Sequence, residues 1–128
     1  RLPALKARSL ARRAIAVPPD LPLAEGLRRA QGAGAGAMVV VTGDGRPSGV
    51  VNEAAVTATP EARRPWVSCS SVARDLQPGL LLDAEIDGER LLRAMQATPA
   101  TEYILLEPSG DVFGVLSTTD VDTAFARS

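Results

Sequence analysis

The sequence is 128 residues long with a formal net charge of −1 at pH 7, which suits one domain large enough to bury a sizeable core. It contains no histidine and one cysteine, Cys69, which excludes Ser-His-Asp and Cys-His catalysis, zinc sites of Cys/His type and an internal disulfide. Hydrophobic residues make up 45% of the chain and aromatic residues only 3%, so small branched side chains must build the core, as in α/β proteins.

Basic residues are concentrated at the beginning of the chain. The first thirteen residues contain no Asp or Glu, and their five basic residues are Arg1, Lys6, Arg8, Arg12 and Arg13. Two interpretations stay open: a piece of a longer protein just cytoplasmic of a membrane segment, or an ordinary solvated stretch. Aromatic residues do not alternate with the basic ones, so we expect no nucleic-acid partner. The single cysteine favours a reducing, cytoplasmic setting, and no apolar run approaches the ~20 residues of a membrane-spanning helix.

Apolar spacing and turn residues predict the elements of the first half of the chain. The segment 9–17 leads into a turn at Pro18-Pro19-Asp20. The elements that follow are a helix over 23–30 between Pro22 and Gly32, strands over 38–41 and through 49–51, and a short helix over 53–58 with Asn52 as its N-cap.

The same order recurs in the second half, with a helix from Asp87 that Thr98-Pro99 stops, strands over 103–106 and 112–116, and a closing helix over 117–125. Sliding residues 23–56 by 65 places them on 88–121 without a gap. Ahead of the helices, Ser9–Arg12 match Ser71–Arg74 at a spacing of 62, so three extra residues lie in the loop that leads into the second copy. The sequence therefore predicts two β-α-β-β-α units packed about a pseudo-twofold axis.

We place the first copy, with its basic lead-in, at residues 1–61 and the second, with a linker, at 62–128. Each copy alone is too small to bury both faces of its sheet, so the two are expected to form one domain. The linker contains Trp66, the chain's one tryptophan. We expect its indole to pack over the join between the copies rather than to bind a ligand.

The second copy ends in Gly114-Val115-Leu116-Ser117-Thr118-Thr119-Asp120, a strand that runs into a helix through a hydroxyl residue and a carboxylate three residues later. This motif, the element order and the gapless duplication resemble the CBS domain and its tandem pair, the Bateman module, over almost the whole chain. The resemblance implies a non-catalytic regulatory domain of α/β (α+β) class. It also implies a homodimer and an adenosine-containing ligand, AMP, ADP, ATP or S-adenosylmethionine, with no required cofactor and no metal.

The resemblance assigns ribose binding to Asp120, because a carboxylate accepts hydrogen bonds from both hydroxyls of a diol, and ribose or phosphate contact to Ser117. The residues themselves allow a second interpretation, in which Ser117 and Asp120 only cap the helix. Weaker candidates are Thr118, as a first-turn hydroxyl, and Glu102 and Tyr103, at the start of the strand whose backbone commonly meets the adenine in the family. A tyrosine at such a position is more often a core residue, which is the favoured interpretation of Tyr103. In the first copy Asn52 and Ala55 stand at the motif positions, so we expect at most one competent cleft.

Four stretches are also similar to the cytoplasmic C-terminal region of actinobacterial site-2-type intramembrane zinc metalloproteases: Pro22–Ala30, Val51–Val56, Arg64–Val67 and Ala94–Tyr103. That resemblance implies a cytoplasmic domain that controls an attached membrane protease, whose His-Glu-x-x-His motif lies outside this sequence. The alternative is a ligand-free structural or dimerisation module of a larger protein. An independent enzyme is not expected, because the chain offers no nucleophile–base pair.

Overall fold

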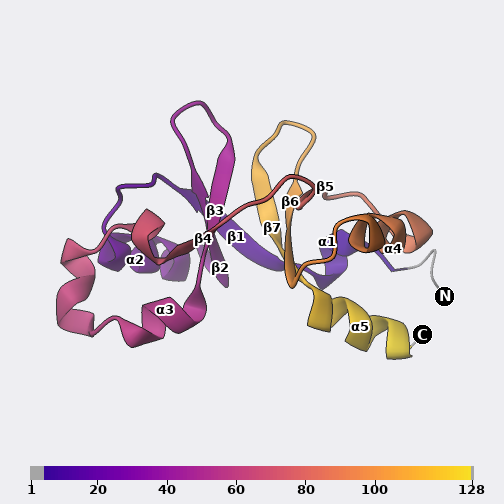
Figure 1. Ribbon diagram of the computed structural model, residues 1–128. Helices are drawn as coiled ribbons and strands as arrows, with labels where there is room; N and C mark the ends of the chain where they lie inside the picture. The colour runs from indigo at the N-terminus through magenta and orange to yellow at the C-terminus, as the bar shows by residue number, and fades with distance from the viewer. Residues whose placement is uncertain (1–4, 128) are drawn as a thin grey trace. The chain divides into compact units, whose positions relative to one another are not determined.

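The computed structural model describes residues 5–127, which form two compact units (Figure 1). One, called here the C-terminal unit, combines residues 5–13 with 77–127. The other, called the inserted unit, consists of residues 14–76. Each unit thus contains chain from both sequence repeats, because the segment that leads into one repeat joins the compact unit of the other.

The inserted unit is a four-stranded sheet ordered β4-β3-β2-β1, with helices in its connections. The end of β1 runs parallel to β2, and the other neighbours are antiparallel. Its elements are the end of β1 (Arg12–Val17), α2 (Leu23–Ala33), β2 (Ala37–Val41), β3 (Pro47–Val51), α3 (Glu53–Ala58), the 3-10 helices η2 (Glu61–Trp66) and η3 (Cys69–Val72), and β4 (Ala73–Asp75).

The C-terminal unit repeats this plan with a sheet ordered β1-β7-β6-β5. Its elements are α1 (Ala7–Leu10), the beginning of β1, β5 (Leu81–Asp83), α4 (Gly88–Ala97), β6 (Glu102–Leu106), β7 (Val112–Ser117) and α5 (Thr118–Arg127). Here β5 and β6 are parallel, while β7 pairs antiparallel with β6 and with the beginning of β1. The predicted helices and strands are confirmed to within a few residues at their ends, and the α/β class with two similar halves is confirmed.

Corresponding backbone hydrogen bonds show how closely the two units agree. In the inserted unit the Leu23 N–H donates to the Val67 carbonyl at 2.7 Å, and in the C-terminal unit the Gly88 N–H donates to the Leu5 carbonyl at 3.1 Å. These residues are related by the same offsets, 65 and 62, that the sequence predicted. The segments around α1 and η3 therefore hold equivalent places in the two units. The segment before α1 is bonded to the start of α4, and the segment before η3 is bonded to the start of α2.

Strand β1 is continuous where its counterpart in the second repeat is broken. Its beginning, Arg12–Arg13, pairs with β7, and its end, Ala14–Val17, pairs with β2. The equivalent stretch of the second repeat is divided into β4 and β5, with residues 76–80 between them. The three extra residues predicted from the offsets lie in this connection, where Gly79 turns the chain at φ 91°.

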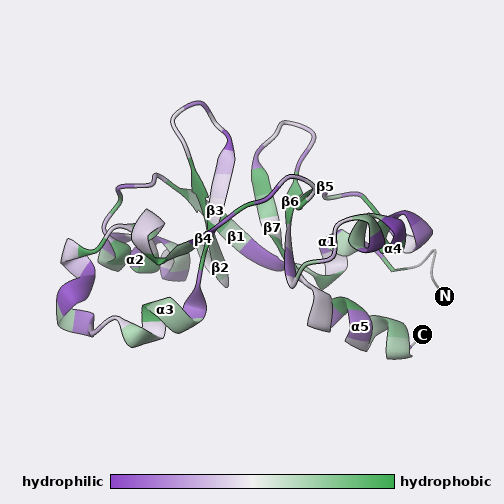
Figure 2. Cartoon of the chain, viewed as in Figure 1, coloured by the Kyte–Doolittle hydropathy of each residue, from purple (hydrophilic) through white to green (hydrophobic). Residues whose placement is uncertain are grey.

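Each unit has its own apolar core, and the hydrophobic stretches of its strands and helices are green in Figure 2. In the C-terminal unit, Tyr103, Leu105 and Leu116 of the sheet pack with Leu91 of α4 and Val121 of α5. The core residues of the inserted unit are Val17, Leu23, Ala30, Met38, Val40, Val51, Cys69 and Val72. Small aliphatic residues dominate both cores, as the composition predicts.

The side chain of Trp66 is exposed to solvent. Its residue is 87% exposed at the end of η2, so the prediction that the indole packs over the join between the copies is wrong. The hydrophobicity of the side chain suggested burial, but Pro65 and the 3-10 geometry of the linker turn Trp66 outward.

Candidate functional site

The junction of β7 and α5 forms half of the predicted capping box. Ser117 ends β7, and its Oγ accepts a hydrogen bond from the Asp120 backbone N–H at 3.1 Å. This bond satisfies one of the first N–H groups of α5, which have no partner within the helix. Asp120 itself is exposed, and within residues 5–127 its carboxylate has no hydrogen-bond or ion-pair partner. Ser117 therefore caps the helix, but the Asp120 carboxylate does not accept the reciprocal hydrogen bond from the Ser117 backbone N–H that would complete a capping box.

Thr118 has a structural contact of its own. Its hydroxyl donates to the Ala100 carbonyl at 2.6 Å, and its backbone N–H donates to the Thr101 carbonyl at 2.9 Å. Both bonds fasten the beginning of α5 to the connection between α4 and β6. Because the hydroxyl proton is used here, Thr118 offers a ligand only acceptor capacity through its side chain.

Tyr103 lies in the core. Its residue is 1% exposed, and its hydroxyl donates to the Thr98 carbonyl at 2.5 Å while accepting from the Ala100 N–H at 3.0 Å. The hydroxyl thus closes the end of α4 and the turn that follows it. The residue as a whole is buried and its hydroxyl is already bonded, so Tyr103 presents neither its side chain nor its backbone to solvent.

Glu102 lies beside Ser117. The two residues are directly opposite in the antiparallel β6–β7 ladder, so their side chains share one face of the sheet. The Glu102 carboxylate also accepts from the guanidinium of Arg12, with a 3.4 Å separation between Nη2 and Oε2. Arg12 is opposite Val115 in β1 and β7, two residues before Ser117, which places it on the same face.

The site residues named from sequence thus fall into two groups. Ser117, Glu102 and the neighbouring Arg12 share one face of the sheet at the end that leads into α5, and Asp120 follows in the first turn of that helix. Tyr103 belongs to the opposite, core-facing side, and Thr118 holds the connection before β6. The contact of Arg12 with Glu102 was missed because these residues are 90 positions apart in the chain.

The inserted unit has the same backbone at this junction without the carboxylates. Asn52 Oδ1 accepts from the N–H groups of Ala54 at 2.9 Å and Ala55 at 3.3 Å, so the predicted cap is confirmed. Ala55 occupies the position of Asp120, and Ala37 that of Glu102. The arginine is retained, because Arg74 of β4 opposes Val50 as Arg12 opposes Val115.

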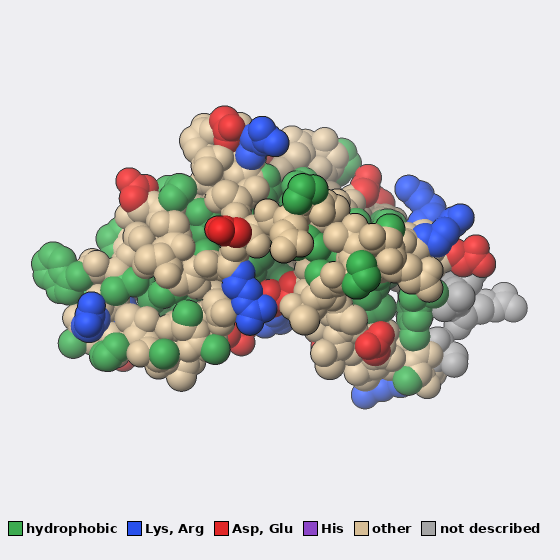
Figure 3. Space-filling model, viewed as in Figure 1, with side chains coloured by type: hydrophobic (Ala, Val, Ile, Leu, Met, Phe, Trp, Pro, Cys, Tyr) green, Lys and Arg blue, Asp and Glu red, His purple; other side chains and the backbone are tan. Residues whose placement is uncertain are grey.

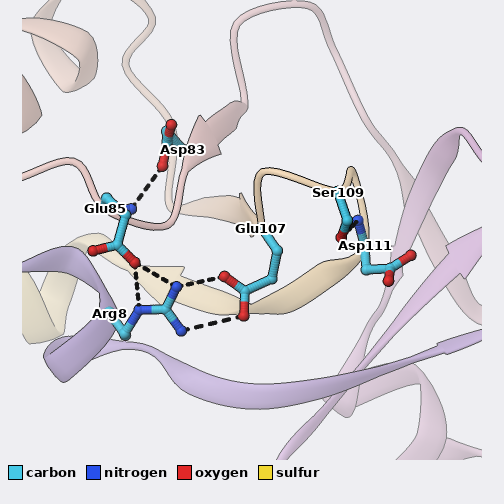
Figure 4. Close-up of polar contacts among 6 residues, drawn as sticks. All are labelled: Arg8, Asp83, Glu85, Glu107, Ser109 and Asp111. Atoms are coloured by element: carbon cyan, nitrogen blue, oxygen red, sulfur yellow. Dashed lines mark hydrogen bonds and ion pairs between the residues drawn. The ribbon is translucent and has the colours of Figure 1, made fainter.

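A second polar cluster ties α1 into the C-terminal unit (Figure 4). The Arg8 guanidinium donates to the Glu85 carboxylate, at 2.8 Å from Nε, and to the Glu107 carboxylate, at 3.3 Å from Nη1. It also lies 4.3 Å from the centre of the Phe113 ring. These bonds raise the pKa of Arg8 and hold the pKa of Glu107 below its usual value. Part of the basic beginning is therefore bound to the unit, which the interpretation as a solvated stretch did not anticipate.

Other chemistries find little support in the described part of the chain. Within residues 5–127 no group of three or more His, Cys, Asp or Glu side chains is placed to hold a metal ion. No helix in that range has the length and apolarity needed to cross a membrane. Cys69 is fully buried, and burial raises the pKa of its thiol, which makes it a poor nucleophile.

Three comparisons with known proteins bear on this geometry. No family model matches the sequence, and no curated protein matches it. Among solved structures, the chain is similar to the CBS domain of a bacterial CNNM/CorC family Mg²⁺ transporter, with a TM-score of 0.64 and 14% identity over 99% of this chain and 78% of that one. The same domain in complex with ATP gives a TM-score of 0.63 at 13% identity over 97% of this chain and 89% of that one.

A CBS-domain-containing protein from Agrobacterium tumefaciens gives a TM-score of 0.61 at 22% identity, over 95% of this chain and 94% of that one. At these identities the similarity concerns the fold. Together with the repeated units described above, it shows that the chain has the fold of a tandem CBS pair, as the sequence motif predicted.

Proposed function

We propose that this chain is a non-catalytic regulatory module that binds an adenosine-containing ligand through Asp120. The observation that carries the proposal is the exposed Asp120 carboxylate, which follows a helix cap that Ser117 already provides. A carboxylate that accepts no protein hydrogen bond within residues 5–127 is available to accept both hydroxyls of a ribose, and charge-assisted bonds of this kind contribute about 1.5–3 kcal/mol each. The ATP complex of a CBS domain with the same fold supports an adenine nucleotide as the ligand.

The proposal includes one ligand site in this chain, in which Asp120 and Ser117 contribute side chains. Glu102 lies beside Ser117 on the same face and Thr118 begins the helix. Ala55 offers no acceptor at the corresponding position of the inserted unit. Figure 3 shows basic side chains at several separate places on the face in view.

The wider role in the proposal is control of an attached membrane zinc metalloprotease by a cytoplasmic, homodimeric module. Its support is the sequence similarity to site-2-type proteases and the basic residues at the beginning of the chain. The ligand would act by preferring one arrangement of the module over another, since a ligand shifts an equilibrium only through its differential affinity for the two states.

The test is a thermal-unfolding series with AMP, ADP, ATP and S-adenosylmethionine on the wild-type chain, Asp120→Asn and Asp122→Asn. Asp122 is the matched control, because it is an exposed carboxylate on the same helix. A ligand at about 100 times its Kd stabilises the wild type by about 2.7 kcal/mol. We expect that gain in Asp122→Asn and its loss in Asp120→Asn. Equal stabilisation by the ligand in all three chains would show that Asp120 does not bind it.

The second candidate is a ligand-free module for structure or dimerisation, which the Asn52 and Ala55 junction of the inserted unit favours. It predicts no stabilisation by any of the four ligands, together with a dimer in sedimentation equilibrium. Stabilisation of the wild type by one ligand, lost in Asp120→Asn, would exclude it.

A further inference from the structure

We infer that Thr118 and Tyr103 are positioning residues for the proposed ligand site. They hold the backbone of Ala100 from two sides and so fix the first turn of α5, which carries Asp120. The inference rests on the proposed function and adds to it: the affinity for the ligand depends on two side chains that do not contact the ligand.

The direction of the Asp120 carboxylate is set by the first turn of α5. In the part of the chain that the structure describes, this carboxylate accepts no hydrogen bond and forms no ion pair, so no neighbouring group holds it. The turn itself is held by bonds to other segments. The Asp120 N–H donates to Ser117 Oγ at 3.1 Å. Thr118 donates through its hydroxyl to the Ala100 carbonyl at 2.6 Å, and through its N–H to the Thr101 carbonyl at 2.9 Å.

The turn to which Thr118 is bonded is closed by Tyr103. The Tyr103 hydroxyl donates to the Thr98 carbonyl at 2.5 Å and accepts from the Ala100 N–H at 3.0 Å. Ala100 is therefore bonded through its N–H to a side chain of β6 and through its carbonyl to a side chain of α5. Because Tyr103 is 1% exposed, its side chain influences a ligand only through the protein groups that it contacts.

The inserted unit closes the equivalent turn with backbone bonds. There Gly34 has a φ of 66° after α2, and the Ala35 N–H donates to a carbonyl of α2 at 2.9 Å. By the offset of 65, Ala35 corresponds to Ala100, and Gly34 corresponds to Pro99. The ring of a proline fixes φ at a negative value, so Pro99 cannot adopt the left-handed conformation that this closure uses. The Tyr103 hydroxyl therefore takes the place of the helix carbonyl as partner of the equivalent N–H.

The tyrosine, the threonine and the carboxylate occur together in the C-terminal unit. In the inserted unit the corresponding positions hold Met38, Glu53 and Ala55. A turn closed by glycine is thus sufficient for the fold, whereas the turn closed by hydroxyl groups accompanies Asp120. This combination is expected if the bonds to Ala100 serve the ligand site as well as the fold.

The test is titration calorimetry of AMP, ADP, ATP and S-adenosylmethionine against the wild type, Thr118→Val, Thr118→Ser, Tyr103→Phe and Thr123→Val. Unfolding curves verify that each chain is folded at the temperature of the titration. Thr118→Val keeps the shape of the side chain and removes the hydroxyl, which Thr118→Ser retains. Tyr103→Phe removes the hydroxyl on the other side of Ala100. Thr123→Val is the matched control, because Thr123 is an exposed threonine on the same helix.

For each ligand that binds the wild type, we expect Thr118→Val to weaken the affinity by about 3- to 10-fold, the equivalent of one hydrogen bond, and Tyr103→Phe by about threefold. Thr118→Ser and Thr123→Val should stay within about twofold of the wild type. Because Thr118 acts through Asp120, adding Thr118→Val to Asp120→Ala should weaken the affinity further by no more than about twofold.

Unchanged affinity in the folded Thr118→Val or Tyr103→Phe chain would overturn the inference for that residue and leave the proposed function standing. The same loss from Thr118→Val with and without Asp120 would also overturn it, because Thr118 would then contact the ligand itself. If none of the four ligands binds the folded wild type, the proposed function is refuted, and this inference with it.

Discussion

The two units of this chain have the same backbone and different chemistry. Each ends a strand in a side chain that caps the next helix, Ser117 in one and Asn52 in the other, and the bonds to the backbone are alike. The carboxylates differ, because Glu102 and Asp120 correspond to Ala37 and Ala55. The cap is what the fold requires at this junction, and neither carboxylate is needed for it. The difference therefore separates residues that build the junction from residues available for a ligand.

The cores show the same backbone filled in two ways. In the C-terminal unit the buried residues at one pair of equivalent positions are Leu91 of α4 and Ala7 of α1. In the inserted unit these positions hold Gly26 of α2 and Cys69 of η3. The larger side chain is on the helix in one unit and on the lead segment in the other, and both arrangements are buried.

The largest expected effect tests this exchange of volume. Leu91→Ala leaves a cavity at a residue of 0% exposure and is expected to cost about 2–5 kcal/mol of unfolding free energy in urea denaturation. Gly26→Ala adds a Cβ 2.8 Å from the Cys69 Sγ, but the gain in helix propensity, about 1 kcal/mol, offsets the crowding, so the net change is small. In the Cys69→Ala background the same Gly26→Ala change should become more favourable. Equal costs for Leu91→Ala and Gly26→Ala would show that the two cores are not filled in this complementary way.

The next prediction concerns Gly49 and Gly114, two glycines at which a neighbouring strand of the sheet approaches closely. A Cβ on Gly49 would lie 2.9 Å from the Arg74 carbonyl oxygen, and one on Gly114 would lie closer still to the carbonyl oxygen of Arg12. Both obstacles are backbone atoms of a paired strand, which cannot move aside as a side chain can. We expect Gly114→Ala to cost about 1–3 kcal/mol by thermal unfolding and Gly49→Ala less. The reverse order would contradict the closer strand approach in the C-terminal unit.

The smallest expected effect is the change in stability with pH that arises from two carboxyl groups, Glu25 and Glu107. In the inserted unit the bonds from Arg28 and Arg29 lower the pKa of Glu25 to about 2, all within α2. In the C-terminal unit the bonds from Arg8 lower the pKa of Glu107, across 99 residues of chain. Because both carboxyls are more acidic in the folded chain, each contributes its full stabilisation above the ordinary pKa of 4.5 and loses it as the pH falls through its folded-state pKa, which is about 2 for Glu25.

Unfolding midpoints of Glu25→Gln and Glu107→Gln between pH 6 and 2 measure this contribution. Each variant should be less stable than the wild type at pH 6 and should lose less stability on acidification. We expect Glu107→Gln to have the larger effect at pH 6, since Arg8 joins separate segments while Glu25 acts within one helix. If the unfolding midpoints of the wild type and the variants fall by the same amount down to pH 2, the lowered pKa values of Glu25 and Glu107 are not the cause of the acid sensitivity.

Sequence alone predicted what depends on neighbours in the chain. Apolar spacing placed the helices, the Asn52 cap was correct in every detail, and the two offsets located the additional residues between β4 and β5. It did not predict pairings between distant segments. The partners of Arg8 are 77 and 99 residues away, and no local pattern selects them from the other carboxylates of the chain.

Hydrophobicity alone failed for Trp66, because exposure of a linker side chain is decided by the direction in which its backbone turns. The candidate site was likewise predicted only in part. The Ser117 cap and the core position of Tyr103 followed from local sequence, whereas the lack of a hydrogen-bond partner for the Asp120 carboxylate within residues 5–127 was seen only in the structure.

Membership of residues 5–13 in the C-terminal unit has a consequence for synthesis of the chain. The inserted unit, residues 14–76, is complete once its last strand has left the ribosome, so it can fold while translation continues. The segment with α1 and the beginning of β1 is made before the inserted unit, yet its partner strand β7 is made only at Val112–Ser117. This segment therefore pairs only after the whole inserted unit has been synthesised, and the C-terminal unit bears the entropy of closing the loop formed by the residues between.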